Sequence, residues 1–209
     1  MLLKIKLIRR TSLNNIEKLL LEKPEWKVLE VGCGYSANKR ADVICDILDL
    51  SNFYQNRKFV KLTEKKLPFS NNEFDFVIAS HVLEHIEDID FFIKELQRVS
   101  SKGYIEVPTK LEDNLVFENK KDHFWHMDFD DDKNVLLISK KIQYLEPIIT
   151  VSSVKKLNDY FRKSLVIELY WEDNIQYTLN KSENQKIEKI SLFNLLRKFF
   201  SKKVRIFIK

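Results

Sequence analysis

Short apolar runs alternate with amphipathic segments through the first half of the chain. The apolar runs have the length of buried strands and cover residues 27–31, 42–47, 59–62, 74–80 and 104–107. Apolar residues at helical spacing predict one helix that begins after Ser12 and ends before Pro24, and another that begins at residues 86–88 and ends near Ser101. Alternating strands and helices predict a mostly parallel sheet covered by helices.

The second half of the chain is less regular. No periodicity is visible over residues 109–134, which predicts a long functional loop. A strand over 135–138 is expected next, followed by a helix capped by Ser152 or Ser153. Residues 165–171 and 175–179 predict a hairpin. We therefore expect one domain over 1–180, a polar linker over 181–189 and an amphipathic tail over 190–209.

Glycine is scarce, and its placement indicates a ligand site. Of the three glycines, Gly32 and Gly34 directly follow the first predicted strand, and Gly103 is expected to form the turn into the fifth. Glycine permits positive φ and lets a ligand approach the backbone closely, as at the nucleotide ends of α/β sheets. Position 37 is Ala, so the motif is not a full dinucleotide fingerprint.

Composition limits the class of protein. A chain of 209 residues with 44% hydrophobic residues is globular, and two cysteines form no disulfide framework. We expect a cytoplasmic protein, because no secretory leader and no spanning helix are predicted. The net charge is +5, yet residues 189–209 hold seven Lys or Arg and no acid, which leaves −2 on residues 1–188. The domain is thus an improbable nucleic-acid binder. The basic tail either packs on the domain or binds an anionic membrane surface at the inner face of the membrane. The oligomeric state is not predicted.

An ordered set of motifs carries a family resemblance over residues 28–108. It comprises Val-Leu-Glu-Val-Gly-Cys-Gly at 28–34, Asp-Val-Ile-Cys-Asp-Ile at 42–47, Leu-Pro-Phe at 67–69, the strand at 74–80 and His-Val-Leu-Glu-His-Ile at 81–86. This set resembles the class I S-adenosylmethionine-dependent methyltransferases, in particular the type 11 group. The resemblance implies an α/β, single-domain, Rossmann-like fold. Its seven-stranded, mostly parallel sheet would have helices on both faces and a C-terminal antiparallel hairpin, and S-adenosyl-L-methionine would be the cofactor.

The same resemblance implies a set of cofactor-binding residues. Glu30 would lie near the methionine end of the cofactor and Asp46 would accept hydrogen bonds from the ribose. Thr63 stands where the family usually carries an Asp toward the adenine, and Glu64 could substitute for it. Ser80 and His81 would border the sulfonium. The full expected set is Glu30, Gly32, Cys33, Gly34, Tyr35, Asp46, Ile47, Thr63, Glu64, Leu67, Ser80 and His81.

Two histidines are candidate catalytic residues. His123 lies in the predicted loop after the fifth strand, which covers the acceptor side in the resembled fold, and could act as a general base. His81 is the second candidate. Residues 81–85 also spell H-x-x-E-H, the inverted zinc-peptidase motif, but we expect no metal because no helix with a third ligand is evident.

The sequence therefore predicts a methyltransferase, and the resemblance and the basic tail favour an O-methyltransferase acting on a sugar or a cell-surface glycan precursor. Two alternatives remain. One is a binding module of methyltransferase fold without catalysis, favoured by the short segment after Gly34 and by Thr63. The other is a zinc hydrolase that uses His81 and His85.

Overall fold

The computed structural model describes residues 7–181 and 191–207. Apart from Lys181, the predicted linker lies outside the described residues. The main sheet contains seven strands: β1 (Leu7–Arg10), β2 (Val28–Val31), β3 (Val43–Asp46), β4 (Lys58–Lys61), β5 (Phe76–Ser80), β6 (Lys102–Pro108) and β9 (Val166–Glu172). A second sheet contains β7 (Trp125–Asp130), β8 (Val135–Lys140) and β10 (Tyr177–Asn180). The helices are α1 (Leu13–Glu22), η1 (Leu83–His85), α2 (Ile89–Val99), α3 (Lys110–Leu115), α4 (Asn119–Asp122), α5 (Val151–Leu165) and α6 (Leu192–Phe207).

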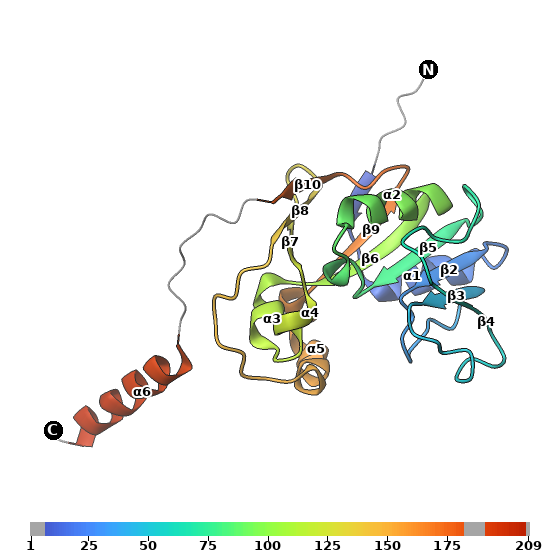
Figure 1. The fold of residues 1–209 in the computed structure, drawn as a ribbon. Coiled ribbons are helices and arrows are strands. Elements are labelled where there is room, and N and C mark those ends of the chain that lie inside the picture. Colours follow the sequence, from blue (N-terminus) through green and yellow to red (C-terminus); the bar gives the residue numbers. More distant parts are fainter. Residues whose placement is uncertain (1–6, 182–190, 208–209) are drawn as a thin grey trace.

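The main sheet has the strand order β1-β9-β6-β5-β2-β3-β4 (Figure 1). Strands β4, β3, β2, β5 and β6 pair in parallel, whereas β9 is antiparallel to both β6 and β1. The predicted seven-stranded, mostly parallel sheet is therefore confirmed. The edge strand β1 was not predicted, because only four residues of this segment lie in the sheet and lysines and arginines surround them.

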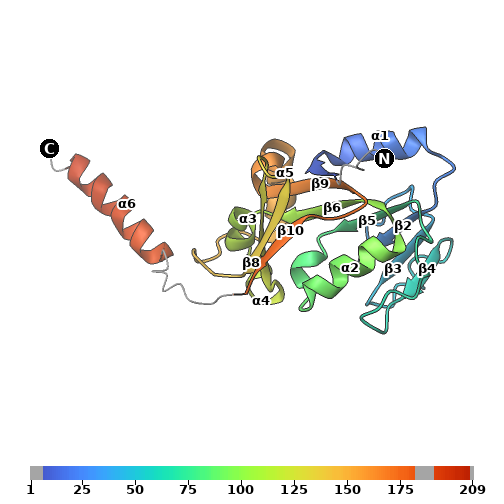
Figure 2. The ribbon, with the colours of Figure 1, turned by 90° about the horizontal axis from the view of Figure 1, so that it is seen from above.

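Helices cover both faces of the main sheet, as predicted. Alternate residues of each central strand point to opposite faces of the sheet, so each strand contributes side chains to two hydrophobic core clusters. On one face, α2 buries Ile89, Phe92 and Ile93 against the sheet. On the other, α1 buries Ile16 and Leu20. Figure 2 shows these two helices on opposite sides of the strands. Ser12 caps α1 through a side-chain hydrogen bond from the Asn15 amide, which confirms the predicted helix start.

The segment 109–134, expected to be a loop, is structured instead. It forms α3, α4 and β7, and β7 pairs antiparallel with β8 in the second sheet. Helices α3 and α4 have six and four residues, too few to show a helical period in the sequence. Trp125, Met127 and Phe129 of β7 are buried in the core cluster that also holds α2. The second sheet therefore packs on the same side of the domain as α2.

The predicted C-terminal hairpin is wrong. Strand β9 enters the main sheet between β6 and β1, whereas β10 pairs in parallel with β8 in the second sheet. The two strands differ in burial, since six of seven residues are buried in β9 and none in β10. A strand buried on both faces belongs in the middle of a sheet, and the sequence of β9 indicates this, since its first six residues are apolar except for Glu168.

Gly103 does not form a turn, contrary to the sequence prediction. It lies inside β6, where a Cβ would approach the Val77 carbonyl oxygen to 2.5 Å and Nε1 of Trp171 to 2.7 Å. Glycine is needed there because the Trp171 side chain of β9 packs directly on the backbone. The helix start near Ser152 also differs by two residues, since Thr150 caps α5 through the Ser153 amide.

The described part of the tail forms one helix, α6, as its spacing predicts. Its Phe193, Leu196, Phe199 and Phe200 side chains are exposed. Figures 1 and 2 draw α6 away from the two sheets. Among the described helices, none has the length and apolar character needed to cross a bilayer.

Candidate functional site

The parallel strands β2, β3, β5 and β6 end at one edge of the main sheet. Ligands of open α/β sheets bind at this edge because the connecting loops diverge there. The residues that follow the strands are the glycine turn after β2, Ile47 after β3, His81 after β5 and Thr109 after β6. Most of the predicted cofactor residues therefore lie along a single edge.

The glycine turn has the predicted backbone. Gly32 and Gly34 have φ values of +70° and +48°. A Cβ on Gly32 would lie 2.3 Å from Cγ2 of Val82, so this position tolerates glycine only. At Gly34 a Cβ would meet nothing within 4 Å. Protein atoms therefore fill the space beside Gly32, whereas the space beside Gly34 is open and a ligand can reach the backbone there.

Asp46 fixes this turn. Its Oδ2 accepts a hydrogen bond from the Gly34 amide at 2.9 Å and its Oδ1 accepts one from Leu48 at the same distance. The carboxylate is buried, whereas the neighbouring Ile47 is 74% exposed. Each carboxylate oxygen can accept a second hydrogen bond, which leaves Asp46 able to bind ribose hydroxyls as predicted.

Glu30 borders a hollow of about 540 Å³ together with Ala37, Asn38, Ser80 and Tyr104. Its Oε2 accepts a hydrogen bond from the Asn38 amide at 2.6 Å. Burial raises the pKa of Glu30 to about 7, against the lowering effect of this hydrogen bond and of Arg57. A cationic group next to Glu30 would favour the charged carboxylate, as the ammonium of a methionine moiety would.

Thr63, Glu64 and Leu67 line a second hollow, of about 340 Å³, together with Ile47 and Phe91. The lining is mostly apolar and suits a flat ring such as adenine. Thr63 and Glu64 are exposed, so both can reach a ligand.

The side chains of Cys33 and Tyr35 do not line these hollows. Cys33 is buried in the core cluster beside Ile44, and burial raises the pKa of its thiol to about 12. Tyr35 contacts Phe53 edge to face, with ring centroids 5.2 Å apart. Only the backbone of Cys33 can face the edge of the sheet.

His81 lies between two carboxylates. Its backbone is left-handed, with a φ of +54°. Its Nδ1 lies 3.2 Å from Oε1 of Glu84, and its Nε2 lies 3.2 Å from Oε1 of Glu106. Burial opposes protonation, but the two carboxylates outweigh it and raise the pKa of His81 to about 10. The ring is therefore a cation at neutral pH, which is unfavourable for the base that a catalytic role would need.

His123 lies in a third hollow, of about 350 Å³, which His81 and His85 also line. We name this hollow the histidine cleft. Nδ1 of His123 is 2.6 Å from Oδ1 of Asp113, a carboxylate that also accepts a hydrogen bond from Lys141 at 2.7 Å. Burial raises the pKa of Asp113, but hydrogen bonds from His123, His126 and Lys141 prevail and hold it well below its usual value.

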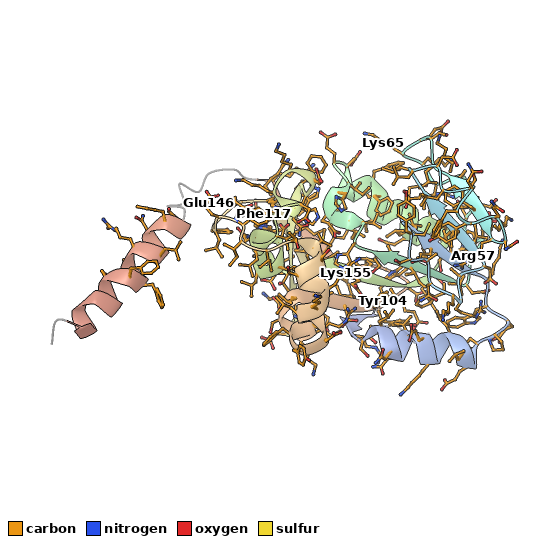
Figure 3. All side chains as sticks on the ribbon, turned by 90° about the horizontal axis from the view of Figure 1, so that it is seen from below. Arg57, Lys65, Tyr104, Phe117, Glu146 and Lys155 are labelled. Carbon is orange, nitrogen blue, oxygen red and sulfur yellow. The ribbon has the colours of Figure 1, made fainter. Side chains whose placement is uncertain are left out.

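The three hollows adjoin. His85 lines both the histidine cleft and the hollow at Thr63, and Ser80, which borders the hollow at Glu30, precedes His81. The structure thus brings together most of the predicted cofactor residues and both predicted catalytic histidines. Lys155 of α5, labelled in Figure 3, also lines the cleft.

Sequence reasoning missed four acidic residues of the site. Glu84, Glu106, Glu112 and Asp113 are absent from the expected site residues. Burial raises the pKa of Glu112, which lines the cleft, to about 7. Glu106 lies within β6. A charged residue in an otherwise apolar predicted strand could have marked it as a candidate functional residue. Residues 112 and 113 lie in the segment without periodicity, where no pattern marked them as buried.

Comparisons with known proteins indicate the family of the chain. A family model described as a methyltransferase domain matches residues 29–105. An uncharacterised protein of Methanocaldococcus jannaschii is 31% identical over 168 residues, which cover 69% of this chain and 73% of that protein. The ajmaline N-methyltransferase of Rauvolfia serpentina is 28% identical over 101 residues, 39% of this chain and 35% of the plant enzyme. A solved methyltransferase structure from Aquifex aeolicus has a TM-score of 0.42 and 14% identity, with 76% of this chain and 87% of that chain covered.

Proposed function

Because the chain belongs to the class I S-adenosylmethionine-dependent methyltransferases, we propose that it methylates a hydroxyl group of a sugar or a glycan precursor held in the histidine cleft. S-adenosylmethionine is the methyl donor of this family and, when bound, supplies an electrophilic methyl group on a sulfonium. The residues of this chain must select the methyl acceptor and must include the group that takes its proton.

The residues at the sheet edge fit this cofactor. The open side of Gly34 admits a ligand to the backbone, and Asp46 retains free lone pairs for a diol. The apolar hollow of Ile47 and Leu67 would hold the adenine, and the buried carboxylate of Glu30 would hold the ammonium. The hollow at Glu30 includes Ala37, which follows the glycine turn in sequence, and the hollow at Thr63 includes Ile47, which follows Asp46.

One observation carries the choice of a hydroxyl acceptor, the pair formed by His123 and Asp113. A hydroxyl must lose a proton when it is methylated, so a base helps. Asp113 is held ionised and can only accept, so Nδ1 of His123 carries the proton and Nε2 keeps a free lone pair. A carboxylate that orients a histidine in this way prepares it to take a proton from a substrate.

The lining of the cleft supports a polyhydroxylated acceptor. Glu118, Asn119, Asp122 and Asn158 surround it with side-chain oxygens and amides, and Lys155 adds one cation. Such side chains match the donors and acceptors of sugar hydroxyls. An amine acceptor, as the name of the Rauvolfia relative implies for that enzyme, would not need a base once it is neutral.

The test uses the full chain, radiolabelled S-adenosylmethionine and two acceptor panels, one of sugars and nucleotide sugars and one of amines. We expect label to enter the sugar panel. Binding of S-adenosylhomocysteine, measured by calorimetry, establishes whether the cofactor site works independently of the acceptor. Transfer to amines alone would overturn the acceptor class, and cofactor binding without transfer to any acceptor would favour the non-catalytic binding module.

A further inference from the structure

Glu84, His85 and His123 bring three potential metal ligands together at the histidine cleft. One donor atom from each residue lies within 4.8 Å of the others. Glu84 and His85 belong to η1, and His123 follows α4, so segments about forty residues apart in sequence build the cluster. The Phe124 amide donates to the Glu84 carbonyl oxygen at 2.8 Å and ties these two segments together.

The two histidines use the same ring nitrogen, Nδ1, to contact an oxygen. Nδ1 of His123 is 2.6 Å from the Asp113 carboxylate, and Nδ1 of His85 is 2.9 Å from the Asp122 carbonyl oxygen. Neither oxygen can donate, so both Nδ1 atoms carry a hydrogen, and in the neutral ring Nε2 is the nitrogen with the lone pair that a metal requires. Metal-binding histidines have this arrangement, in which a carboxylate or a backbone carbonyl fixes the ring through its second nitrogen.

Glu84 supplies an independent indication. Its side chain is 1% exposed, and Oε1 is 3.2 Å from Nδ1 of His81. Its other oxygen, Oε2, is buried and has no hydrogen-bond partner among the described residues. Leaving a buried carboxylate oxygen unpaired is costly, and a cation bound there would remove that cost.

We propose that Glu84, His85 and His123 bind a divalent transition-metal ion such as Zn²⁺. Two imidazoles and one carboxylate favour such an ion over Mg²⁺ or Ca²⁺, which prefer oxygen ligands. Three protein ligands leave at least one coordination position open, as in catalytic metal sites. Ligands about 2.1 Å from a common ion lie roughly 3 to 4 Å apart, so a small closing movement of the three side chains completes the site.

This set differs from the H-x-x-E-H motif of residues 81–85. That motif would use His81 and His85 from one helix, but η1 is a single short turn. Both ring nitrogens of His81 face carboxylates, Nδ1 toward Glu84 and Nε2 toward Glu106. His81 therefore holds Glu84 in place, and His123 takes the position of the second imidazole. The expectation that the chain has no metal site is revised by this proposal.

The role of the ion, though not its binding, rests on the proposed function. Glu84, His85 and His123 all line the cleft where the acceptor hydroxyl would lie, so an ion that they held could contact that hydroxyl. Such an ion would lower the pKa of the bound hydroxyl and would take over the activation otherwise expected of a free His123. Glu112, which lines the same cleft, would be the acceptor of the hydroxyl proton.

The test titrates the full chain, freed of metal by a chelator, with Zn²⁺ by calorimetry and with Co²⁺ by visible absorption. We expect one ion per chain and the absorption bands of Co²⁺ bound to nitrogen and oxygen. Glu84→Gln and His123→Ala should lower the affinity at least a hundredfold, and Asp113→Asn by roughly ten- to a hundredfold. Asp128→Asn is the matched control, because this exposed carboxylate pairs with Lys110 and does not line the cleft, and it should bind like wild type.

Circular dichroism and S-adenosylhomocysteine binding report whether each variant folds, and the exposed His85→Gln serves if a buried variant does not. Absence of binding at millimolar Zn²⁺ and Co²⁺, or unchanged binding in Glu84→Gln and His85→Gln, would overturn the site. Failure of the proposed function has a different signature, namely metal binding that persists while no hydroxyl acceptor is methylated. Methyl transfer unaffected by the chelator would overturn the role of the ion alone.

Discussion

The amide of Gly34 donates a hydrogen bond to Oδ2 of Asp46 over 2.9 Å. This contact joins the turn after β2 to the end of β3, two positions that the sequence separates by 12 residues. Because of this hydrogen bond, the Asp46 carboxylate, which is predicted to bind the ribose, also fixes the turn over which the cofactor would lie. Substitutions at either residue therefore act on both the turn and the ligand.

Asp46→Ala should weaken binding of S-adenosylhomocysteine by roughly 1 to 3 kcal/mol, because hydrogen bonds to a charged acceptor are lost. Calorimetry measures the affinity. Asp42→Ala is the control, since Asp42 accepts hydrogen bonds from Val28 and Arg40 near the start of the same strand and away from the proposed site. Equal affinity losses in both variants would contradict the assignment of Asp46 to the cofactor.

The two glycines of the turn should respond differently to alanine. Gly32→Ala places a Cβ against Val82 and should destabilise the fold as well as abolish cofactor binding. Gly34→Ala meets no protein atom, so its cost to folding should be limited to about 1 kcal/mol for its left-handed backbone. Thermal unfolding and calorimetry separate the effects. A Gly34→Ala variant with intact affinity would show that no ligand approaches this turn.

His123→Ala should lower turnover roughly a hundredfold or more while cofactor affinity stays nearly constant. The expectation holds whether the imidazole acts as a base or as a metal ligand, and metal titration distinguishes the two. Parallel losses of turnover, cofactor affinity and thermal stability would instead assign His123 a structural role through its contact with Asp113.

His81 should make the stability of the fold depend on pH. Its pKa is raised from an ordinary value of 6.5 to about 10 in the folded state, so its ion pairs contribute fully below pH 6.5 and are lost as the pH rises through 10. We expect the difference in unfolding free energy between wild type and His81→Gln to shrink over this interval. Denaturant unfolding at several pH values measures it, and a difference independent of pH would contradict the prediction.

Helix α6 should bind anionic membranes. Its exposed phenylalanines and leucine lie at helical spacing, and its basic residues would each add about 1 kcal/mol near an anionic surface. We expect the full chain to sediment with anionic vesicles at low salt and to be released at high salt. A chain that ends at Glu188 should stay folded and unbound. Unfolding of that shorter chain would show that the tail packs on the domain.

Much of the main sheet could be predicted from the sequence, because strands buried on both faces read as continuous apolar runs. The glycine turn was found because it follows such a run directly, and Asp46 because it lies near the end of another. Residues 109–130 could not be predicted, because α3 and α4 are shorter than a detectable period and the burial of Asp113 depends on Lys141 and His126, which are distant in sequence. The placement of β10 likewise depends on β8 and not on its neighbour β9.

Strand β9 occupies an inner position in the main sheet although it is the last of that sheet's strands to be synthesised. Its neighbours β6 and β1 are complete long before Val166–Glu172 leaves the ribosome, and Leu7 pairs with Glu172. Until then the free edge of β6 exposes unpaired backbone groups, a known template for association with other chains. The nascent protein can therefore associate with other chains through this edge until β9 is in place. A chain stopped before residue 166 would lack β9, which is the partner of β1 in the sheet.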